Sequence, residues 1–383
     1  MCTRIAPPCP FTRLVAISLG IAACGGGGTD AGDSTVWAVD SVPVFAVGQL
    51  EGDSVYQLYR VRGIAELPDG AVAIANRGSS EIRLYDASGR FVRALGRDGS
   101  GPGEFGGLLN LMARGDTLYA YDRMYGRLTR FLSSGAYLDD RSLRRDATTM
   151  TPDFSGLLRD GAVAAGTRSL IGDGFQRDSV VLLRIDQDGS ADTLGTFPGN
   201  ENMIQTRHLG GGASTMTGWF WSFYRVFLSV AAGDRIYAAP TDSAVIYVWD
   251  GSGAPLDTLR WDDLPRPLDA ALATALFERE TANLEPAERE QERKAFREAV
   301  LPATAPVFDR LVLGPDGELW VRRFDQPGAE ISEWLVFAAD GSLRARARIP
   351  LEREIRAVSR ERVYTVERDE YDVEYVRGYT LHR

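Results

Sequence analysis

The chain has 383 residues, of which 44% are hydrophobic and 25% are charged, and its formal net charge is −10. An acidic chain repels phosphate backbones, so nucleic acid is not an expected partner. The only histidines are His208 and His382, which excludes a histidine-rich zinc site, and the cysteines (Cys2, Cys9 and Cys24) all precede residue 25, which excludes internal disulfides beyond it.

The N-terminal segment predicts export from the cytoplasm. Arg4 and Arg13 occur without any acidic residue, and an apolar run follows at residues 14–23. A basic segment before a short apolar run is typical of a secretory signal peptide, and ten residues are too few to span a bilayer as a helix.

The run ends in Ile21-Ala22-Ala23-Cys24, which resembles the lipobox of bacterial lipoproteins. The resemblance implies that residues 1–23 are removed and that Cys24 is lipidated, so the protein would be anchored in the cell envelope. Residues 24–34 are glycine-rich and polar, as expected of a flexible tether. In this family, aspartate directly after the cysteine retains the protein at the inner membrane. The residue here is Gly25, so the resemblance favours anchoring in the outer membrane, with the protein facing the periplasm or the cell surface. The alternative is an ordinary signal peptide cut elsewhere, which would release a free periplasmic protein.

Residues 35–383 show self-similarity with a period of about 45 residues, which predicts an all-β chain of four-stranded propeller blades. The segment 64–105 shows short alternating runs separated by turn residues, and glycine and aspartate suit tight hairpins because they tolerate positive φ. The first hairpin turn of each predicted blade falls at residues 69–70, 115–116, 160–161, 233–234, 316–317 and 360–361. These positions predict a six-bladed β-propeller with two insertions.

Residues 94–105 (ALGRDGSGPGEF), 115–122 (GDTLYAYD) and 126–131 (GRLTRF) resemble an NHL repeat. The resemblance is clear in the first two blades and extends to the others by periodicity alone. A propeller of the NHL-repeat/TolB-like type implies an architecture with a binding face, and it implies no particular activity.

The last blade lacks one strand. Residues 354–358, 362–367 and 372–381 supply three strands, and we expect residues 35–47 to supply the fourth by pairing with residues 372–381. That pairing would close the ring and remove an open sheet edge.

Two segments interrupt the period. Residues 268–300 show helical spacing, and Pro286 suits the start of a second helix, so a helical hairpin is predicted between blades four and five. It could be a lid, a partner surface or a solvated excursion on the propeller edge. The other insertion, residues 199–226, carries aromatic residues that could line the entrance to a ligand-binding site or pack between blades.

Alignment of the blades on their first turn places arginine repeatedly at the end of the second strand. The loops after these strands face one opening of the central channel, and we call the set of residues predicted there the mouth ring. It consists of Arg77, Arg123, Arg168, Arg323 and Arg368, with Asp242 in the fourth blade. Arginine binds carboxylate and phosphate with bidentate geometry, so the ring would bind an anion. The alternative is that each arginine pairs with a nearby acid, such as Asp122, Asp242, Asp325 or Glu367.

Enzymatic activity is left open, and a binding role is favoured. Some six-bladed propellers are calcium-dependent hydrolases or lactonases, and Asn76, Asp122 and Asp242 are the candidate ligands for such an axial ion. No other cofactor is predicted. The expected function is that of a monomeric, membrane-anchored recognition module for a small anionic ligand or a protein partner outside the cytoplasm.

Overall fold

The computed structural model describes residues 35–143, 152–168, 172–210 and 213–383, which fall in one compact unit. The predicted signal peptide, Cys24 and the tether lie outside the described residues. None of the described helices has both the length and the apolar character needed to cross a bilayer.

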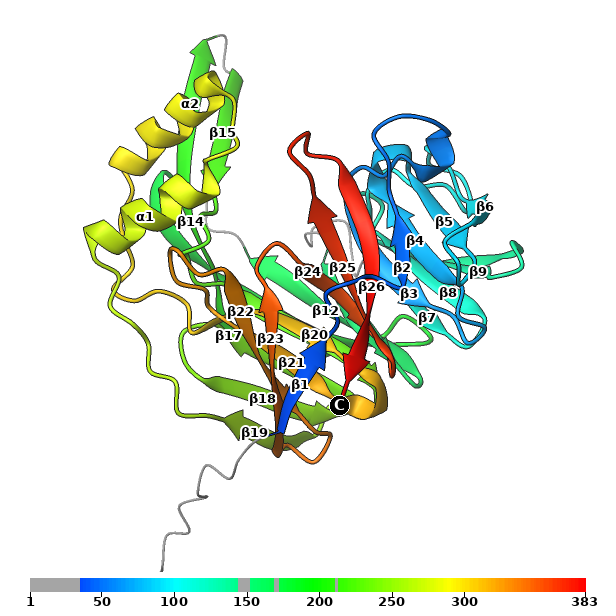
Figure 1. The fold of residues 1–383 in the computed structure, drawn as a ribbon. Coiled ribbons are helices and arrows are strands. Elements are labelled where there is room, and N and C mark those ends of the chain that lie inside the picture. Colours follow the sequence, from blue (N-terminus) through cyan, green and yellow to red (C-terminus); the bar gives the residue numbers. More distant parts are fainter. Residues whose placement is uncertain (1–34, 144–151, 169–171, 211–212) are drawn as a thin grey trace, which may run out of the picture. The chain divides into compact units, whose positions relative to one another are not determined.

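Most of the described chain is β-strand, folded as mainly antiparallel sheets in which most strands pair in chain order (Figure 1). Glycines at the turn positions allow this: Gly70 and Gly89 adopt φ of 82° and 85° in the first sheet. Three short 3-10 helices connect strands, namely η1 (Ser54–Tyr56), η2 (Arg77–Ser79) and η3 (Pro315–Gly317). The first two sheets contain β3 (Val61–Glu66), β4 (Val72–Asn76), β5 (Glu81–Tyr85), β6 (Phe91–Leu95), and β7 (Leu108–Arg114), β8 (Thr117–Asp122), β9 (Arg127–Leu132), β10 (Tyr137–Ser142).

The following groups continue the same pattern. The next two contain β11 (Asp153–Leu158), β12 (Gly161–Arg168), β13 (Gly174–Asp186), β14 (Ala191–Gly210), β15 (Ala213–Trp219), and β16 (Phe227–Gly233), β17 (Arg235–Pro240), β18 (Val245–Asp250), β19 (Pro255–Arg260). These two groups form one continuous sheet, because β11 pairs in parallel with β16. The last two contain β20 (Phe308–Leu313), β21 (Leu319–Arg323), β22 (Ile331–Phe337), β23 (Leu343–Pro350), and β24 (Glu354–Val358), β25 (Arg362–Arg368), β26 (Glu374–His382).

The N-terminal strands complete the last group. β1 (Thr35–Val39) and β2 (Phe45–Val47) both pair antiparallel with β26, with Ala38 opposite His382 and Phe45 opposite Gly378. The predicted pairing of residues 35–47 with the C-terminal strand is therefore confirmed. β1 also pairs in parallel with β23, which the sequence did not predict. The N-terminal strand thus joins the last two groups into one continuous sheet.

The hydrophobic core is divided into clusters that each lie between consecutive sheets. One cluster joins the first two sheets through Leu84 and Leu118, for example, and another joins the second and third through Leu128 and Leu183. The series continues around the molecule and ends with a cluster that packs the last sheet on the first. The sheets are therefore held face to face in cyclic order by apolar side chains.

We call β3, β7, β11, β16, β20 and β24 the first strands, because each begins its sheet. Most neighbouring first strands lie in contact, and the contacts include β24 with β3, so the last sheet meets the first. Small residues permit this close approach. A Cβ on Gly63 would lie 2.7 Å from the backbone nitrogen of Leu111, and one on Gly156 would lie 1.9 Å from the carbonyl oxygen of Ala231.

Helices α1 (Ala270–Glu280) and α2 (Pro286–Arg297) lie between β19 and β20, within the range 268–300 that the sequence singled out. They pack against the long β14–β15 hairpin, beside which they lie in Figure 1. Trp219, Trp221, Phe223 and Tyr224 are buried there among apolar side chains of the helices. These aromatic residues therefore form a hydrophobic core of their own, and of the run only Phe220 is strongly exposed.

Candidate functional site

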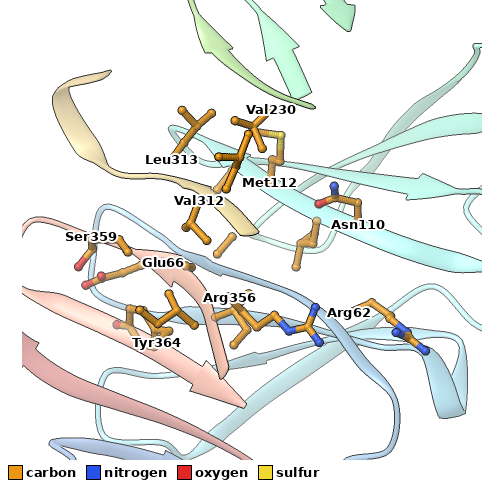
Figure 2. Close-up of a pocket in the computed structure, with 18 of the residues that line it drawn as sticks. Arg62, Glu66, Asn110, Met112, Val230, Val312, Leu313, Arg356, Ser359 and Tyr364 are labelled. Carbon is orange, nitrogen blue, oxygen red and sulfur yellow. The ribbon is translucent and has the colours of Figure 1, made fainter. Parts of the chain in front are cut away.

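A cavity of about 420 Å³ is lined by residues from every first strand. Figure 2 shows the side chains of Arg62 and Arg356 extending toward one end of this cavity, whereas Glu66, Ser359 and Tyr364 gather at the other. We refer to these as the arginine end and the Glu66 end. The cavity is the place where all the sheets meet, so it is the natural candidate for a binding site.

β-Bulges recur near the beginning of the first strands. The pairing register shifts between Val61 and Gly63 in β3 and between Ile355 and Ala357 in β24, so Arg62 and Arg356 occupy the bulged positions. Among the described residues, comparable shifts occur in β7, β11 and β20, whereas β16 pairs without one. A bulge re-aims a side chain and bends its strand. In β3, β11 and β24 the bulged residue itself lines the cavity, whereas in β7 and β20 it is the residue after the bulge, Asn110 or Arg310, that does so.

The arginine end carries three guanidinium groups and the carboxylate of Glu354, and the mutually neutralising Arg322–Asp309 ion pair lies nearby. Arg310 Nη2 lies 2.5 Å from Glu354 Oε1, and Arg356 Nη2 lies 2.9 Å from Glu354 Oε2. The Arg62 side chain makes no hydrogen bond or ion pair with another described residue, and its Nε is buried. The arginine end therefore has an excess of positive charge.

Burial shapes the protonation of this cluster. It lowers the pKa of Arg310, although Glu354 opposes the effect. Burial alone would raise the pKa of Glu354, but the Arg310 and Arg356 guanidiniums hold that pKa below its ordinary value. Glu354 is therefore ionised at neutral pH, and it offsets only part of the arginine charge.

Smaller polar groups and apolar side chains complete the wall. Asn110 from β7 lines the cavity, as does Ser155 from β11, whose Oγ lies 2.6 Å from the Ser229 Oγ. Apolar side chains of Val312 and Leu313 lie between the two ends (Figure 2). The cavity thus combines converging cations with a wall of mixed polar and apolar character, which suits a small organic anion.

The mouth ring predicted from the sequence does not coincide with this site, because none of its members with a described side chain lines the cavity. Arg123 pairs with Asp153 at 3.0 Å, and Arg323 pairs with Asp263 at 2.6 Å. Arg368 pairs with Glu374 at 2.8 Å. Arg77 makes no side-chain bond with another described residue, and the side chain of Arg168 lies outside the described part of the chain. No ion pair or hydrogen bond among the described side chains links two members of the ring.

Asp242 and the calcium candidates have structural partners. Asp242 binds Arg177 through both carboxylate oxygens, at 2.6 and 2.5 Å. Asp122 is fully buried and accepts hydrogen bonds from the backbone nitrogens of Gly106, Gly107 and Tyr125.

Asn76 accepts a hydrogen bond from the backbone nitrogen of Tyr59 and donates one to Ser79. Across the described residues, no three histidine, cysteine, aspartate or glutamate side chains converge as metal ligands would. The three candidates do not fit a shared calcium ion, because their oxygens already hold separate loops and arginines.

The sequence also indicated the cavity residues. That indication lies in the first strand of each repeat, whereas the predicted ring was taken from the end of the second strand. Arg62, Asn110, Ser155, Arg310 and Arg356 are polar residues near the beginnings of strands that are otherwise rich in buried apolar residues. Polar residues in the first run of each repeat indicate side chains that point to the centre of a ring of sheets.

Consecutive sheets packed in cyclic order around a central cavity define a β-propeller-like fold. Solved structures with a similar fold include a predicted exported protein of Bacteroides fragilis, with 12% identity, a TM-score of 0.50, and coverage of 92% of this chain and 97% of that one. A member of the DUF4221 family from Bacteroides vulgatus is similar, with 10% identity, a TM-score of 0.50, and coverage of 91% and 99%. No protein-family model matches the sequence. No curated protein matches it either.

Proposed function

We propose that the chain is a six-bladed β-propeller, lipid-anchored through Cys24, that binds a small anionic ligand outside the cytoplasm at Arg62, Arg310 and Arg356. The observation that carries the proposal is the charge balance at the arginine end. Three guanidiniums meet there, and Glu354 is the carboxylate bonded to two of them. An anion that accepts hydrogen bonds from Arg62 and Arg356 would neutralise the remaining charge and satisfy buried donors.

The six-bladed assignment rests on the strand groups and on the cyclic core. Each first strand opens a group of antiparallel strands, and the group of β24, β25 and β26 is completed by β1 and β2. A final blade built from both ends of the chain closes a ring without an open sheet edge.

Anion binding can be measured directly. We expect wild-type protein to bind succinate or sulfate in calorimetric titrations, and we expect Arg62→Gln or Arg356→Gln to weaken binding about tenfold, as befits a lost charged hydrogen bond. Arg77→Gln is a matched control, because Arg77 is an arginine of the originally predicted ring that lies outside the cavity. Unchanged binding in both cavity variants, with intact folding, would refute this site, and a loss confined to Arg77→Gln would restore the predicted ring.

The anchor is tested separately from the binding site. The basic segment, the apolar run and the Ile21-Ala22-Ala23-Cys24 sequence support lipidation, and the B. fragilis protein of similar fold is named as exported. We expect a fatty-acid label to be incorporated into wild-type protein and to be absent from Cys24→Ser, which should leave the membrane fraction. Membrane retention and labelling of Cys24→Ser would contradict the anchor and leave the anion site untouched.

A further inference from the structure

The cavity has unpaired polar atoms of opposite kind at its two ends. At the arginine end, the Nε atoms of Arg62, Arg310 and Arg356 are buried donors without a hydrogen-bond partner. At the other end, Glu66 Oε2 is a buried acceptor without a partner. Buried donors and acceptors are normally paired, so these atoms indicate what a bound molecule would offer at each end.

The Glu66 carboxylate interacts with Tyr364 and with Arg362, but its Oε2 has no hydrogen-bond partner. Its nearest cation is Arg362, whose Nη1 lies 3.8 Å from Glu66 Oε1, beyond hydrogen-bond distance. The same Arg362 nitrogen donates a hydrogen bond to the Tyr364 hydroxyl at 3.2 Å. Burial, reinforced by the charge of Glu66, raises the pKa of Tyr364, so its hydroxyl stays neutral. A ligand ammonium group could therefore hydrogen-bond to Glu66 without displacing an existing hydrogen bond to Oε2.

The distance between the two ends sets the length of the ligand. Arg62 and Glu66 are four residues apart in β3, so their Cα atoms are separated by about 13 Å at about 3.3 Å per residue, or slightly less because of the bulge at Arg62. Their side chains extend toward opposite ends of the cavity in Figure 2, so the charged groups are no closer together than the Cα atoms. Both line one cavity, and apolar residues including Val312 and Leu313 lie between its ends. A free amino acid is too short to reach both groups. A peptide of about three or four residues spans that distance in extended form, at 3.3–3.6 Å per residue.

We propose that the anionic ligand is a short zwitterionic peptide with small apolar side chains, bound along the cavity. Its carboxylate lies at Arg62 and Arg356, and its terminal ammonium group lies at Glu66. This inference rests on the proposed anion site, and it adds both the second recognised group and the polarity of binding.

The test uses three matched peptides with the purified full-length protein. Tetra-alanine carries both charges, N-acetyl-tetra-alanine lacks the ammonium group, and tetra-alanine amide lacks the carboxylate. We expect tetra-alanine to bind best in calorimetric titrations, and we expect each blocked peptide to bind about tenfold more weakly, because each leaves one charged hydrogen bond unmade.

Variants of Glu66 assign the preference for a free N-terminus. In Glu66→Gln, acetylation should no longer weaken binding, whereas amidation should still do so. Glu66→Asp should retain part of the preference because it keeps the charge. Glu361→Gln is the control, since Glu361 is an exposed carboxylate that lines the neighbouring pocket shared with Glu66.

The outcomes separate the two proposals. Equal binding of tetra-alanine and its acetylated form to wild-type protein would overturn the peptide assignment, whereas weaker binding of the amide would still support the anion site. Equal binding of all three peptides, or no binding of any, would overturn the peptide assignment, and sulfate titration would then decide the anion site alone. If Glu66→Gln fails to fold, the wild-type comparison still decides.

Discussion

Arg310 and Arg356, which lie on the neighbouring first strands β20 and β24, are bridged by the carboxylate of Glu354. This shared pairing ties together two sheets at the arginine end of the cavity and leaves both guanidiniums only partly neutralised. If the proposed anion site is correct, stability and ligand binding are connected, because an anion in the cavity and Glu354 would act on the same two cations.

Replacing Glu354 by glutamine should destabilise the protein and make it respond more strongly to anions. The change leaves two partly buried guanidiniums without their carboxylate, and we expect the free energy of unfolding to fall by about 2 kcal/mol, toward the low end for partly exposed pairs. Urea denaturation measures the loss. Added sulfate should raise the melting temperature of the variant more than that of wild type, with sodium chloride at matched ionic strength as the control. An equal response of both proteins would show that sulfate does not reach these arginines.

The same carboxylate should make part of the stability depend on pH. Although burial opposes ionisation of Glu354, Arg310 and Arg356 lower its pKa in the folded state. Its ionised form therefore stabilises the protein above its ordinary pKa of about 4.3, and that contribution is lost as pH falls through the lower folded-state value. We expect the difference in unfolding free energy between wild type and Glu354→Gln to be constant near neutral pH and to shrink below about pH 4. A difference that grew on acidification would contradict the assigned direction.

Gly156 should tolerate no side chain, because it lies where β11 meets β16. A Cβ at this position would lie 1.9 Å from the Ala231 carbonyl oxygen, and that oxygen belongs to backbone that cannot move aside without breaking the strand pairing. We expect Gly156→Ala to lower the free energy of unfolding by about 3 kcal/mol, or to prevent folding, through overpacking. Gly166→Ala in β12 is the control, since its Cβ would find only ordinary contacts of 3.8 and 3.9 Å. Similar melting temperatures for the two variants would show that the sheets separate more easily than the structure indicates.

Trp37 should be a principal support of the closing strand. It is 3% exposed, its ring lies 5.7 Å from that of Trp320, and the guanidinium of Arg383 lies 4.6 Å from its centroid. We expect Trp37→Ala to cost about 3 kcal/mol, as large-to-small core substitutions do, whereas Val36→Ala, at a residue that is 66% exposed, should cost little. The check is denaturant unfolding of both variants. Equal costs would mean that β1 is not held by its inward face.

Turn chemistry and alternation were sufficient to predict most of the strands, because each hairpin is encoded locally by residues such as Gly70 and Gly89. The pairing of residues 35–47 with the C-terminal strand followed from a simple shortage of one strand. The parallel pairing of β1 with β23 could not be inferred, because the sequence of β1 does not indicate which strand pairs with its second edge.

The sequence predicts a group of arginines, but the arginines that line the cavity are not the ones predicted. Arg323 and Arg368 share a slot in the repeat, but they lie where loops supply local carboxylates, and they pair with Asp263 and Glu374. The side chains of Arg62 and Arg356 reach the cavity from bulges, and a bulge depends on how two strands pair. A one-residue change of register decides which face a side chain takes, and the sequence of one strand does not reveal it.

The pairing of the first strand with the last has a consequence for how the protein is made. The bond between His382 and Asp40 joins residues that are 342 positions apart, and it lies beside the pairing of β1 with β26. During synthesis from the N-terminus, the segment that closes the fold emerges well before its partner and cannot pair until that partner is available. Contacts of such long sequence separation form slowly, since the chain loses much entropy before they stabilise it.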